Sequence, residues 1–448
     1  MKQLVTTSEN FLLSALSKAV LLVGIMSITA MAQIAVPDTN FAAAIRSACP
    51  DCIGNDNKLL PPAAAMKGLD VSGKNIKSLE GIQGFTSLET LLCVSNGLTT
   101  FPSLPSTLIA LYCDINSLES LPALPAGLSM MSCKFNKLKS LPALPNSLTQ
   151  LAINYNEVES LPALPASLTY LDLTRNKLTT IASLPDSLKY FSCNGNLLTS
   201  LPTLPVKLQY FNTSGNKLVS LPNLPSGVTT FYCADNLLES LPELPASLSQ
   251  IFNCSKNKLT ALPVLPSGLK EIDCSFNLLV SLAELPPNLS SLTTEGNQLT
   301  GLPTLPSTLT ILYAKNNRLL SLPALPASLY FLNVQNNLLA CLPELKNSSM
   351  YIYIDANKIS CLPNIPVSLF VFNASNALIP TPPVCPDNIN HTTGAVPASL
   401  YVAKEKIESV GTLAAGTTNY IASQSITLNP GFVVSNSTTF LVEVRTCK

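Results

Sequence analysis

A twenty-residue pattern of apolar and polar positions repeats along most of the chain. It is clearest over residues 161–180, which read LPALPASLTYLDLTRNKLTT. Leu168, Leu171 and Leu173 alternate with polar residues, which predicts a short strand with one buried and one exposed face. A fixed period of this length is typical of a solenoid in which each repeat forms one turn, here called a rung. The pattern extends from about residue 69 to residue 380.

An asparagine marks the same position in each rung, just after the predicted strand. Because a buried amide must be hydrogen-bonded, we expect these side chains to join backbone groups of adjacent rungs as a ladder. After a one-residue slip the series continues from Asn257 at the same period, and Asn75 precedes it. The regular members of the ladder are Asn96, Asn116, Asn136, Asn156, Asn176, Asn196, Asn216 and Asn236.

The path between strands carries the motif LPxLP, as at residues 121–125 and 141–145. Proline fixes φ near −65° and lacks an N–H group, so this path is expected to be extended or polyproline-like and not helical. Strands of successive rungs would lie side by side at about 4.8 Å in a parallel sheet. The predicted fold is therefore a solenoid with a parallel β-sheet on its concave face.

The region before the repeats divides into two segments. Residues 1–32 have the features of a secretory signal peptide: positive charge, an apolar run over residues 19–30 and a small-x-small site before Gln33. An uncut N-terminal anchor helix is the alternative. Residues 33–68 are expected to be an N-terminal cap with a short helix that begins after Asp38, because the first rung must be covered.

The region after the repeats also divides into two segments. Residues 381–395 break the period and are rich in Pro, Asn and Thr, which predicts a linker. Residues 396–448 contain short β-like runs separated by turns, which predicts a small β module.

Three stretches resemble known families. The phrase LxxLxLxxNxLxxLPxLP is similar to the repeat of bacterial leucine-rich-repeat proteins. The run VPDTNF at residues 36–41, the start of the repeats at 69–91 and the cysteines at the inner strand position resemble exported members from Bacteroidetes. The stretch SITLNPGF at 425–432, followed by TTFLVEV, resembles the C-terminal module called the 3-coathanger stack, which implies a structural or export-related role.

Thirteen cysteines cannot all pair within one chain. Cys49 and Cys52 form a CxxC motif, for which an exported chain favours a structural disulfide over redox chemistry or half of a metal site. Neighbouring inner cysteines such as Cys113 and Cys133 are expected to stay reduced, since parallel side chains keep their Cβ atoms too far apart. Cys341 and Cys361, one rung apart at an edge, are candidates for a disulfide.

Composition excludes several kinds of chemistry. Lys+Arg and Asp+Glu number 26 each, so no overall field attracts nucleic acid or an anionic membrane. The only histidine is His391, and the sequence has no HExxH or phosphate-loop motif. We therefore expect no catalytic residues, no metal, no cofactor and no membrane insertion once the signal is removed.

The exposed strand positions offer a binding surface instead. Three consecutive rungs carry Tyr170, Tyr190 and Tyr210 six residues before their asparagines, beside a row of small polar groups at Asp172, Ser192, Asn194 and Asn212. Tyrosines bordered by small polar groups suit recognition of a protein or a glycan. Aromatic residues on adjacent strands also stabilise a sheet without binding anything, and this alternative stays open.

The sequence thus favours an exported, secreted or surface-associated protein that recognises a protein or a surface polysaccharide without catalysis. A protein ligand is favoured because sugar sites often use tryptophan and the chain has none. The LPxLP repeat also resembles that of secreted effector E3 ubiquitin ligases of enteric pathogens. Those carry a large helical catalytic domain after the repeats, whereas about 68 β-rich residues follow them here. A structural surface spacer is the remaining alternative.

Overall fold

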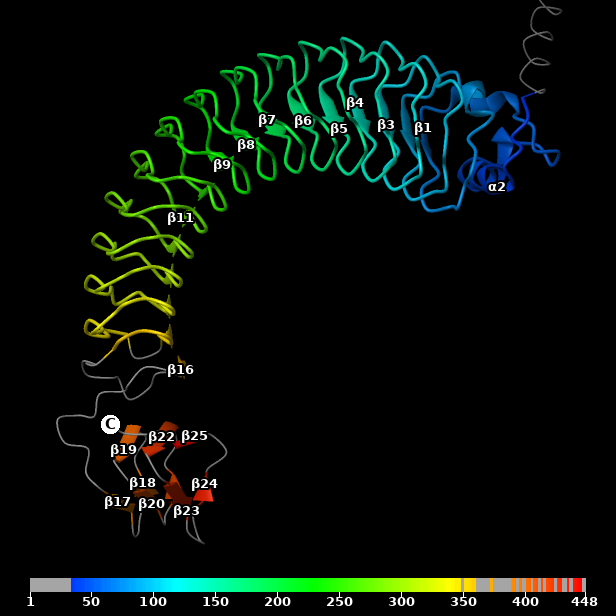
Figure 1. The fold of residues 1–448 in the computed structure, drawn as a ribbon. Helices are drawn as coiled ribbons and strands as arrows, with labels where there is room; N and C mark the ends of the chain where they lie inside the picture. Colours follow the sequence, from blue (N-terminus) through cyan, green and yellow to red (C-terminus); the bar gives the residue numbers. More distant parts are fainter. Residues whose placement is uncertain are drawn as a thin grey trace, which may run out of the picture. The chain divides into compact units, whose positions relative to one another are not determined.

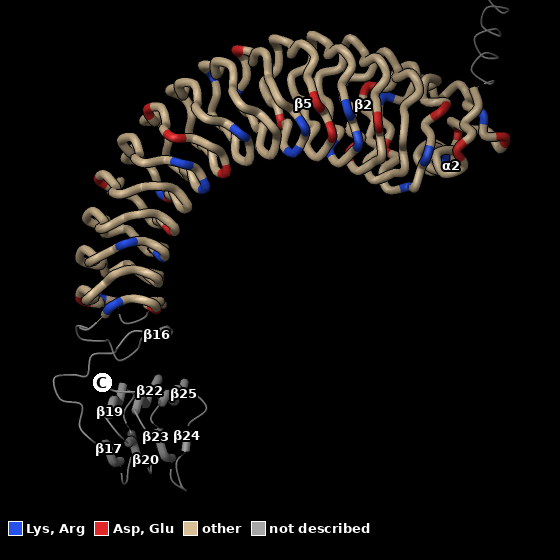
Figure 2. The backbone as a smooth tube through the Cα atoms, in the orientation of Figure 1, with Lys and Arg blue, Asp and Glu red and all other residues tan. Residues whose placement is uncertain are grey.

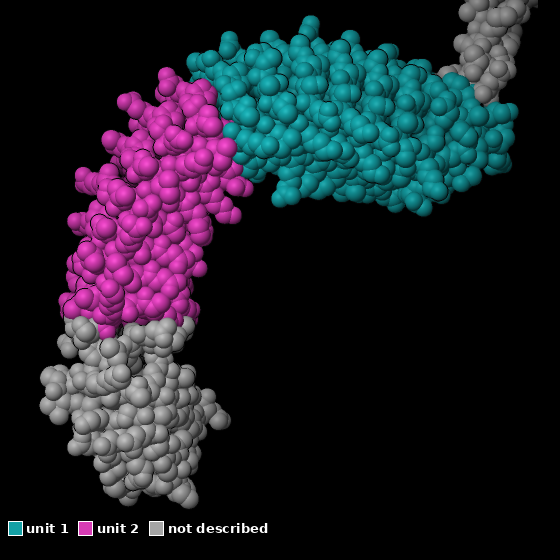
Figure 3. Space-filling view, in the orientation of Figure 1, with its two compact units in different colours: residues 1–217 teal, residues 218–448 magenta. Residues whose placement is uncertain are grey.

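A computed structural model describes residues 34–347 and 350–359, together with the backbone of short strands between residues 371 and 444 (Figure 1). The predicted signal peptide over residues 1–32 lies outside the described residues. Two compact units divide the chain at residues 217 and 218 (Figure 3), and each unit is described by itself. Within the part of the chain that the structure describes, no helix has the length and apolarity needed to cross a membrane.

The cap begins with the α-helix α2, Thr39–Ala48, close to where the sequence placed it. The Asp38 carboxylate accepts hydrogen bonds from the backbone N–H groups of Asn40 and Phe41, so Asp38 is the N-cap. The helix buries Phe41, Ala42, Ala44 and Ile45. Two short 3₁₀ helices, η1 (Pro50–Cys52) and η2 (Pro61–Ala65), complete the cap before the first strand.

Each rung of the first unit contributes one three-residue strand, and consecutive strands pair in parallel. One further 3₁₀ helix, η3 (Ile82–Gly84), lies between the first two strands. The strands are β1 (Gly68–Asp70), β2 (Thr90–Leu92), β3 (Ala110–Tyr112), β4 (Met130–Ser132), β5 (Gln150–Ala152), β6 (Tyr170–Asp172), β7 (Tyr190–Ser192) and β8 (Tyr210–Asn212).

The second unit repeats this arrangement with parallel strands in sequence order. The one-residue slip is absorbed before β10, because Phe252 still pairs with Phe231. The strands are β9 (Thr230–Tyr232), β10 (Ile251–Asn253), β11 (Glu271–Asp273), β12 (Ser291–Thr293), β13 (Ile311–Tyr313), β14 (Phe331–Asn333), β15 (Tyr351–Tyr353) and β16 (Val371–Asn373).

The core of each rung is formed by the inner positions of the pattern. Leu168, Leu171, Leu173 and Leu178 are completely buried, as the alternation predicted. After Gly84, the described repeat residues form no helix, because the LPxLP segments run extended between the strands. The predicted leucine-rich-repeat solenoid with an all-parallel sheet is confirmed.

Serine and threonine form a second hydrogen-bonded column that the sequence pattern did not reveal. The Ser167 hydroxyl donates to the carbonyls of Asn146 and Leu148 in the preceding rung, at 2.7 and 2.6 Å. Ser147, Ser187 and Ser328 make equivalent pairs of contacts. These hydroxyls satisfy carbonyls of the proline-containing path, which has no strand partners of its own.

The residue before each ladder asparagine adopts the left-handed conformation. This position is glycine in some rungs, such as Gly195 and Gly215, but it is Ile115, Phe135 and Tyr155 in three consecutive rungs, with φ between 51° and 58°. In the first rung the left-handed residue is Gly73 and the ladder position is Lys74, since the N–H of Ile76 donates to Asn96 as that of Leu98 donates to Asn116; Asn75 follows this position and does not start the ladder. Left-handed conformation is costly for β-branched and bulky residues.

Replacement of Ile115 by asparagine is therefore expected to raise the free energy of unfolding by about 0.5–1 kcal/mol. Asn316 and Asn336 already occupy the same turn position with φ of 55° and 53°. The matched control is Ile109→Asn, at a similarly exposed isoleucine that is not among the positive-φ residues, where no gain is expected. Urea unfolding of both variants measures the difference, and an equal response at the two sites would contradict the explanation.

The cysteines follow the predictions only in part. The structure has the Cys49–Cys52 disulfide, with Cα atoms 5.3 Å apart. Cys341 is also disulfide-bonded, while Cys361 lies outside the described residues. The expectation that Cys113 and Cys133 stay reduced is wrong, because they form a disulfide across a Cα separation of 4.8 Å. Rotation about the Cα–Cβ bonds turns the two sulfurs toward each other, a movement that the fixed parallel side chains assumed from sequence did not include.

Short parallel strands follow the repeats and begin before the predicted module boundary. One of them, β17 (Asn388–His391), lies within residues 381–395, and β18 (Ala395–Val396) begins at the last of these residues, so the expected linker contains strand structure. The Pro, Asn and Thr residues there predicted turns, but a strand of two to four residues fits between such turns. The others are β19 (Leu400–Ala403), β20 (Lys406–Ser409), β21 (Thr412–Leu413), β22 (Gly416–Ala422), β23 (Ser425–Leu428), β24 (Val433–Val434) and β25 (Thr438–Val444). They form three parallel sheets of three strands each.

Candidate functional site

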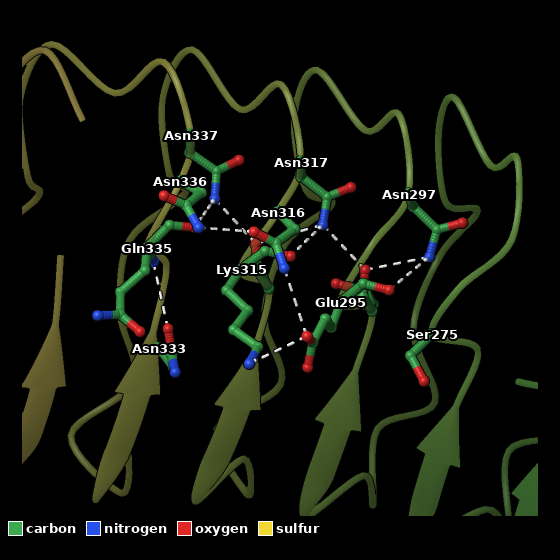
Figure 4. Close-up of polar contacts among 12 residues, drawn as sticks. Ser275, Glu295, Asn297, Lys315, Asn316, Asn317, Asn333, Gln335, Asn336 and Asn337 are labelled. Carbon is green, nitrogen blue, oxygen red and sulfur yellow. Dashed lines mark hydrogen bonds and ion pairs between the residues drawn. The ribbon is translucent and has the colours of Figure 1, made fainter. Parts of the chain in front are cut away.

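The ladder asparagines bind adjacent rungs together. The Asn176 amide donates to the carbonyls of Leu173 in its own rung and Ile153 in the preceding rung, at 3.0 Å each. Its Oδ1 accepts the N–H of Val158 at 3.0 Å. The same three contacts recur at Asn116, Asn136, Asn156, Asn196 and beyond. Figure 4 shows the amide nitrogens of Asn297, Asn317 and Asn337 directed at neighbouring groups in this way. These side chains stabilise the scaffold and do not face a ligand.

The three tyrosines form a continuous stack on the exposed face of β6, β7 and β8. Tyr170 pairs with Tyr190, and Tyr190 with Tyr210, in the strand register. Neighbouring ring centroids are 4.3 Å apart, with interplanar angles of 12° and 6°. Both faces of the Tyr190 ring are therefore covered by its neighbours. What the stack presents to a partner is a row of ring edges and hydroxyl groups.

The hydroxyl groups of Tyr170 and Tyr190 remain protonated at neutral pH. Burial, the charge of Asp172 and the more distant Tyr210 raise the pKa of Tyr170, although a hydrogen bond with the neighbouring Tyr190 lowers it in part. Burial and the two flanking tyrosines raise the pKa of Tyr190 still further. Each hydroxyl is thus a neutral group that can both donate and accept hydrogen bonds.

The polar residues beside the stack partly support the strand ends. Asp172 and Asn212 each accept a hydrogen bond from the backbone N–H two residues later, at 3.0 Å. Ser192 is only 3% exposed and its hydroxyl lies 2.8 Å from that of Thr174. Asn194 lies at the half-buried edge, where its carbonyl accepts the N–H of Arg175. The strand register places Asp172, Ser192 and Asn212 side by side, so they form one polar border along the tyrosines.

A second column of exposed side chains follows the left-handed turns. The rings of Phe135 and Tyr155 stack at 4.3 Å, and the Arg175 guanidinium lies 5.2 Å from the centre of the Tyr155 ring. Phe135 is 47% exposed and Tyr155 37%. These rings are not among the residues predicted above as a binding surface. Their place immediately before a ladder asparagine, where other rungs have glycine, is the signal that distinguishes them.

The second unit carries a polar network on the equivalent surface (Figure 4). Lys315 forms a salt bridge with Glu295 at 3.0 Å, and Asn316 donates to the same carboxylate oxygen. Asn336 in turn donates to the Asn316 side chain at 2.7 Å. Figure 2 shows basic and acidic residues interspersed along each unit, so neither described unit presents a continuous stripe of one charge.

The described residues do not assemble a metal-binding group: no three His, Cys, Asp or Glu side chains within 34–347 and 350–359 are arranged to hold an ion. The single histidine, His391, is the last residue of β17, and its side chain lies outside the described part. The surface features that the structure does describe are rings, hydroxyls and amides, which suit binding.

Comparison with known proteins gives structural matches only, since no family profile and no curated protein matches the sequence. The structure is similar to YopM from Yersinia enterocolitica, with a TM-score of 0.58 and 28% identity over 85% of this chain and 91% of that one. It is also similar to YopM of Yersinia pestis, described as a leucine-rich effector protein, with a TM-score of 0.60 and 35% identity over 69% and 88% of the two chains.

A third structure shares the fold at lower identity. It is the functional domain of InlJ from Listeria monocytogenes, said to include a cysteine ladder, with a TM-score of 0.61 and 24% identity over 81% of both chains. The strand order, the asparagine ladder and these matches define the class of a leucine-rich-repeat solenoid. The chain belongs to the leucine-rich-repeat proteins, and the relatives found at 28% and 35% identity are bacterial.

Proposed function

We propose that this protein is a non-catalytic recognition protein that binds a protein partner through the exposed face of β6, β7 and β8. The observation that carries the proposal is the tyrosine stack, which presents three hydroxyls and ring edges in one rigid row. Tyrosine supplies apolar area and a hydrogen-bonding group while little side-chain entropy is lost on binding. Its border adds the polar groups of Asp172 and Asn212, which are already fixed by hydrogen bonds, while Ser192 between them is buried.

The stack geometry favours a protein partner over a glycan. A sugar ring packs against the open face of an aromatic ring, whereas neighbouring rings cover the faces of Tyr190. Ring edges and hydroxyls instead suit the backbone and side-chain groups of a protein surface. The alternation of acidic and basic residues along the unit also suits a partner without a large net charge.

We also propose that the protein acts outside the cytoplasm. The sequence features of residues 1–32, the resemblance to exported Bacteroidetes proteins and the many cysteines support this location. The strands β17 to β25 are compatible with a C-terminal module of the 3-coathanger type, with a structural or export-related role.

The test uses residues 33–448 immobilised for pull-down from candidate partner proteins, with a glycan array in parallel. A triple Tyr170/Tyr190/Tyr210→Phe variant keeps the stacked rings but removes the hydroxyls, and Thr149→Ala in the same unit is the control. We expect the triple variant to lose at least about tenfold in affinity, because buried hydroxyl partners would be left unpaired.

The melting temperature of each variant is measured first, so that a folding defect is not mistaken for lost binding. Binding that the triple variant retains would move the site away from this stack. Binding to glycans alone would replace the protein partner with a polysaccharide, and no binding in either arm would favour a surface spacer.

A further inference from the structure

Two groups of three cysteines occupy the inner strand position in consecutive rungs. The first unit has Cys93, Cys113 and Cys133, and the second unit has Cys233, Cys254 and Cys274. All six are buried with no exposed surface. The first group contains one disulfide, Cys113–Cys133, and one free thiol, whereas the second group contains three free thiols.

The backbone surrounds the two groups in the same way. The N–H of Cys113 donates to the carbonyl of Ser132, the residue before Cys133, at 2.8 Å. The N–H of Cys233 donates to the carbonyl of Asn253, before Cys254, at 2.8 Å, and that of Cys254 to Asp273, before Cys274, at 2.9 Å. The extra residue between Cys233 and Cys254 does not disturb this, because Asn253 aligns with Tyr232 on one side and Asp273 on the other.

This shared geometry places adjacent cysteines within reach of each other. The Cα atoms of the bridged pair Cys113 and Cys133 are 4.8 Å apart. Disulfides usually join Cα atoms about 4.4–6.8 Å apart, and parallel strands keep neighbours at about 4.8 Å. Cys254 therefore has two possible partners, one in each adjacent rung, while Cys233 and Cys274 are two rungs apart.

We propose that Cys233, Cys254 and Cys274 form an oxidative modification site that holds one disulfide, and that this disulfide always includes Cys254. The oxidant is a small-molecule disulfide of the glutathione class. A Cys254 thiolate attacks one sulfur of the oxidant and releases one thiol. Cys233 or Cys274 then attacks Cys254 in the mixed disulfide and releases the second thiol, so two cysteines are oxidised and one small disulfide is reduced.

The first group follows the same rule, with Cys113 as its central member. The Cys93 thiolate can attack the sulfur of Cys113, so that a Cys93–Cys113 bond forms and Cys133 leaves as a thiolate that takes up a proton. This exchange needs no external oxidant, since the number of disulfides does not change. After oxidation of the second group, each group therefore carries one disulfide and one thiol, and the thiol can take the place of the outer partner in the disulfide.

The remaining inner cysteine serves as an internal control. Cys193 has Leu173 and Thr213 at the same position in the adjacent rungs, and its thiol lies 3.5 Å from the Thr213 hydroxyl. Burial raises the pKa of Cys193 to about 12, and burial likewise raises the pKa values of the other inner thiols. Since the thiolate is the reacting form, these cysteines react while the rungs are assembling or transiently open.

The experiment refolds the full chain from urea in a buffer of reduced and oxidised glutathione, alkylates the remaining thiols and maps the disulfides by mass spectrometry. We expect cross-linked peptides that join Cys254 to Cys233 or to Cys274, and an increase of several degrees in Tm over the reduced protein. Cys254→Ser should abolish both cross-links, whereas Cys233→Ser and Cys274→Ser should each retain the other one. Cys193→Ser should change neither.

The native Cys113–Cys133 disulfide shows in the same digest whether oxidation has occurred. If this disulfide forms while Cys233, Cys254 and Cys274 all remain alkylated, the proposal is wrong. Cross-links from Cys193 to any of the three, or between Cys233 and Cys274 in the wild type, would also overturn it. If Cys254→Ser folds poorly, the two other single variants still test the proposal. Cys233→Ser must show only the Cys254–Cys274 cross-link, and Cys274→Ser must show only the Cys233–Cys254 cross-link.

Discussion

Replacing Asn176 with alanine is expected to lower the free energy of unfolding by about 3 kcal/mol. The change removes the only acceptor that the structure gives to the Val158 N–H, and it removes one of two donors from each of the carbonyls of Ile153 and Leu173. Asn176 is 8% exposed, so water cannot replace these partners without opening the rung. Chemical denaturation followed by circular dichroism measures the loss.

The matched control is Asn154→Ala, in the preceding rung. The Asn154 Oδ1 atom is buried and makes no hydrogen bond, so its removal should be nearly neutral. Similar losses at both positions would show that the ladder contacts are not the source of the stability. A larger loss at Asn176 alone would assign the stability to the bonds between rungs.

Replacing Asp38 with alanine is expected to destabilise the first unit by about 2 kcal/mol and to release the cap helix from the first repeat. One carboxylate oxygen caps α2, and the other accepts the N–H groups of Lys77 and Ser78 at 2.7 and 3.0 Å. Asp38 therefore ties the helix to the repeat through four hydrogen bonds. Amide hydrogen exchange at Lys77 and Ser78 should accelerate in the variant, while Asp51→Ala, an exposed residue in the same cap, serves as the control.

The same contact predicts a dependence on pH. Burial alone would raise the pKa of Asp38, but the backbone hydrogen bonds outweigh it and hold this pKa below the ordinary value. A group whose pKa is depressed by folding stabilises the protein above its unfolded pKa, and that stability is lost as the pH falls through the folded value. The wild type should therefore lose cap stability in acid below about pH 4, whereas the Asp38→Ala variant should lack this component of the pH dependence.

The sequence predicted the scaffold well because two local rules agreed at every rung. The spacing of Leu168, Leu171 and Leu173 identified the buried face, and the asparagine after each strand identified the register. Proline in the LPxLP path excluded helices on the return. Strand pairing needed no further information, since each rung can contact only its neighbours.

The sequence could predict which residues align on the exposed face, but not which atoms of their side chains are accessible. The sequence aligned Tyr170, Tyr190 and Tyr210, but the 4.3 Å stacking that hides their faces depends on side-chain rotation. The same limitation led to the wrong prediction for Cys113 and Cys133. The pattern of alternation also gave no position for Phe135 and Tyr155, which lie past the strand end, where the left-handed turn interrupts the alternation.

The reach of the ladder asparagines has a consequence for the length of the molecule. The Asn176 amide contacts its own rung and the one before it, and the same pattern holds at Asn136 and Asn317. If a complete twenty-residue segment between equivalent positions were removed, each remaining ladder amide would still find an equivalent backbone carbonyl and N–H group in the rung before it. Folding therefore sets no limit on the number of rungs, and duplication or deletion of such segments can adjust the span of the binding face to the size of its partner.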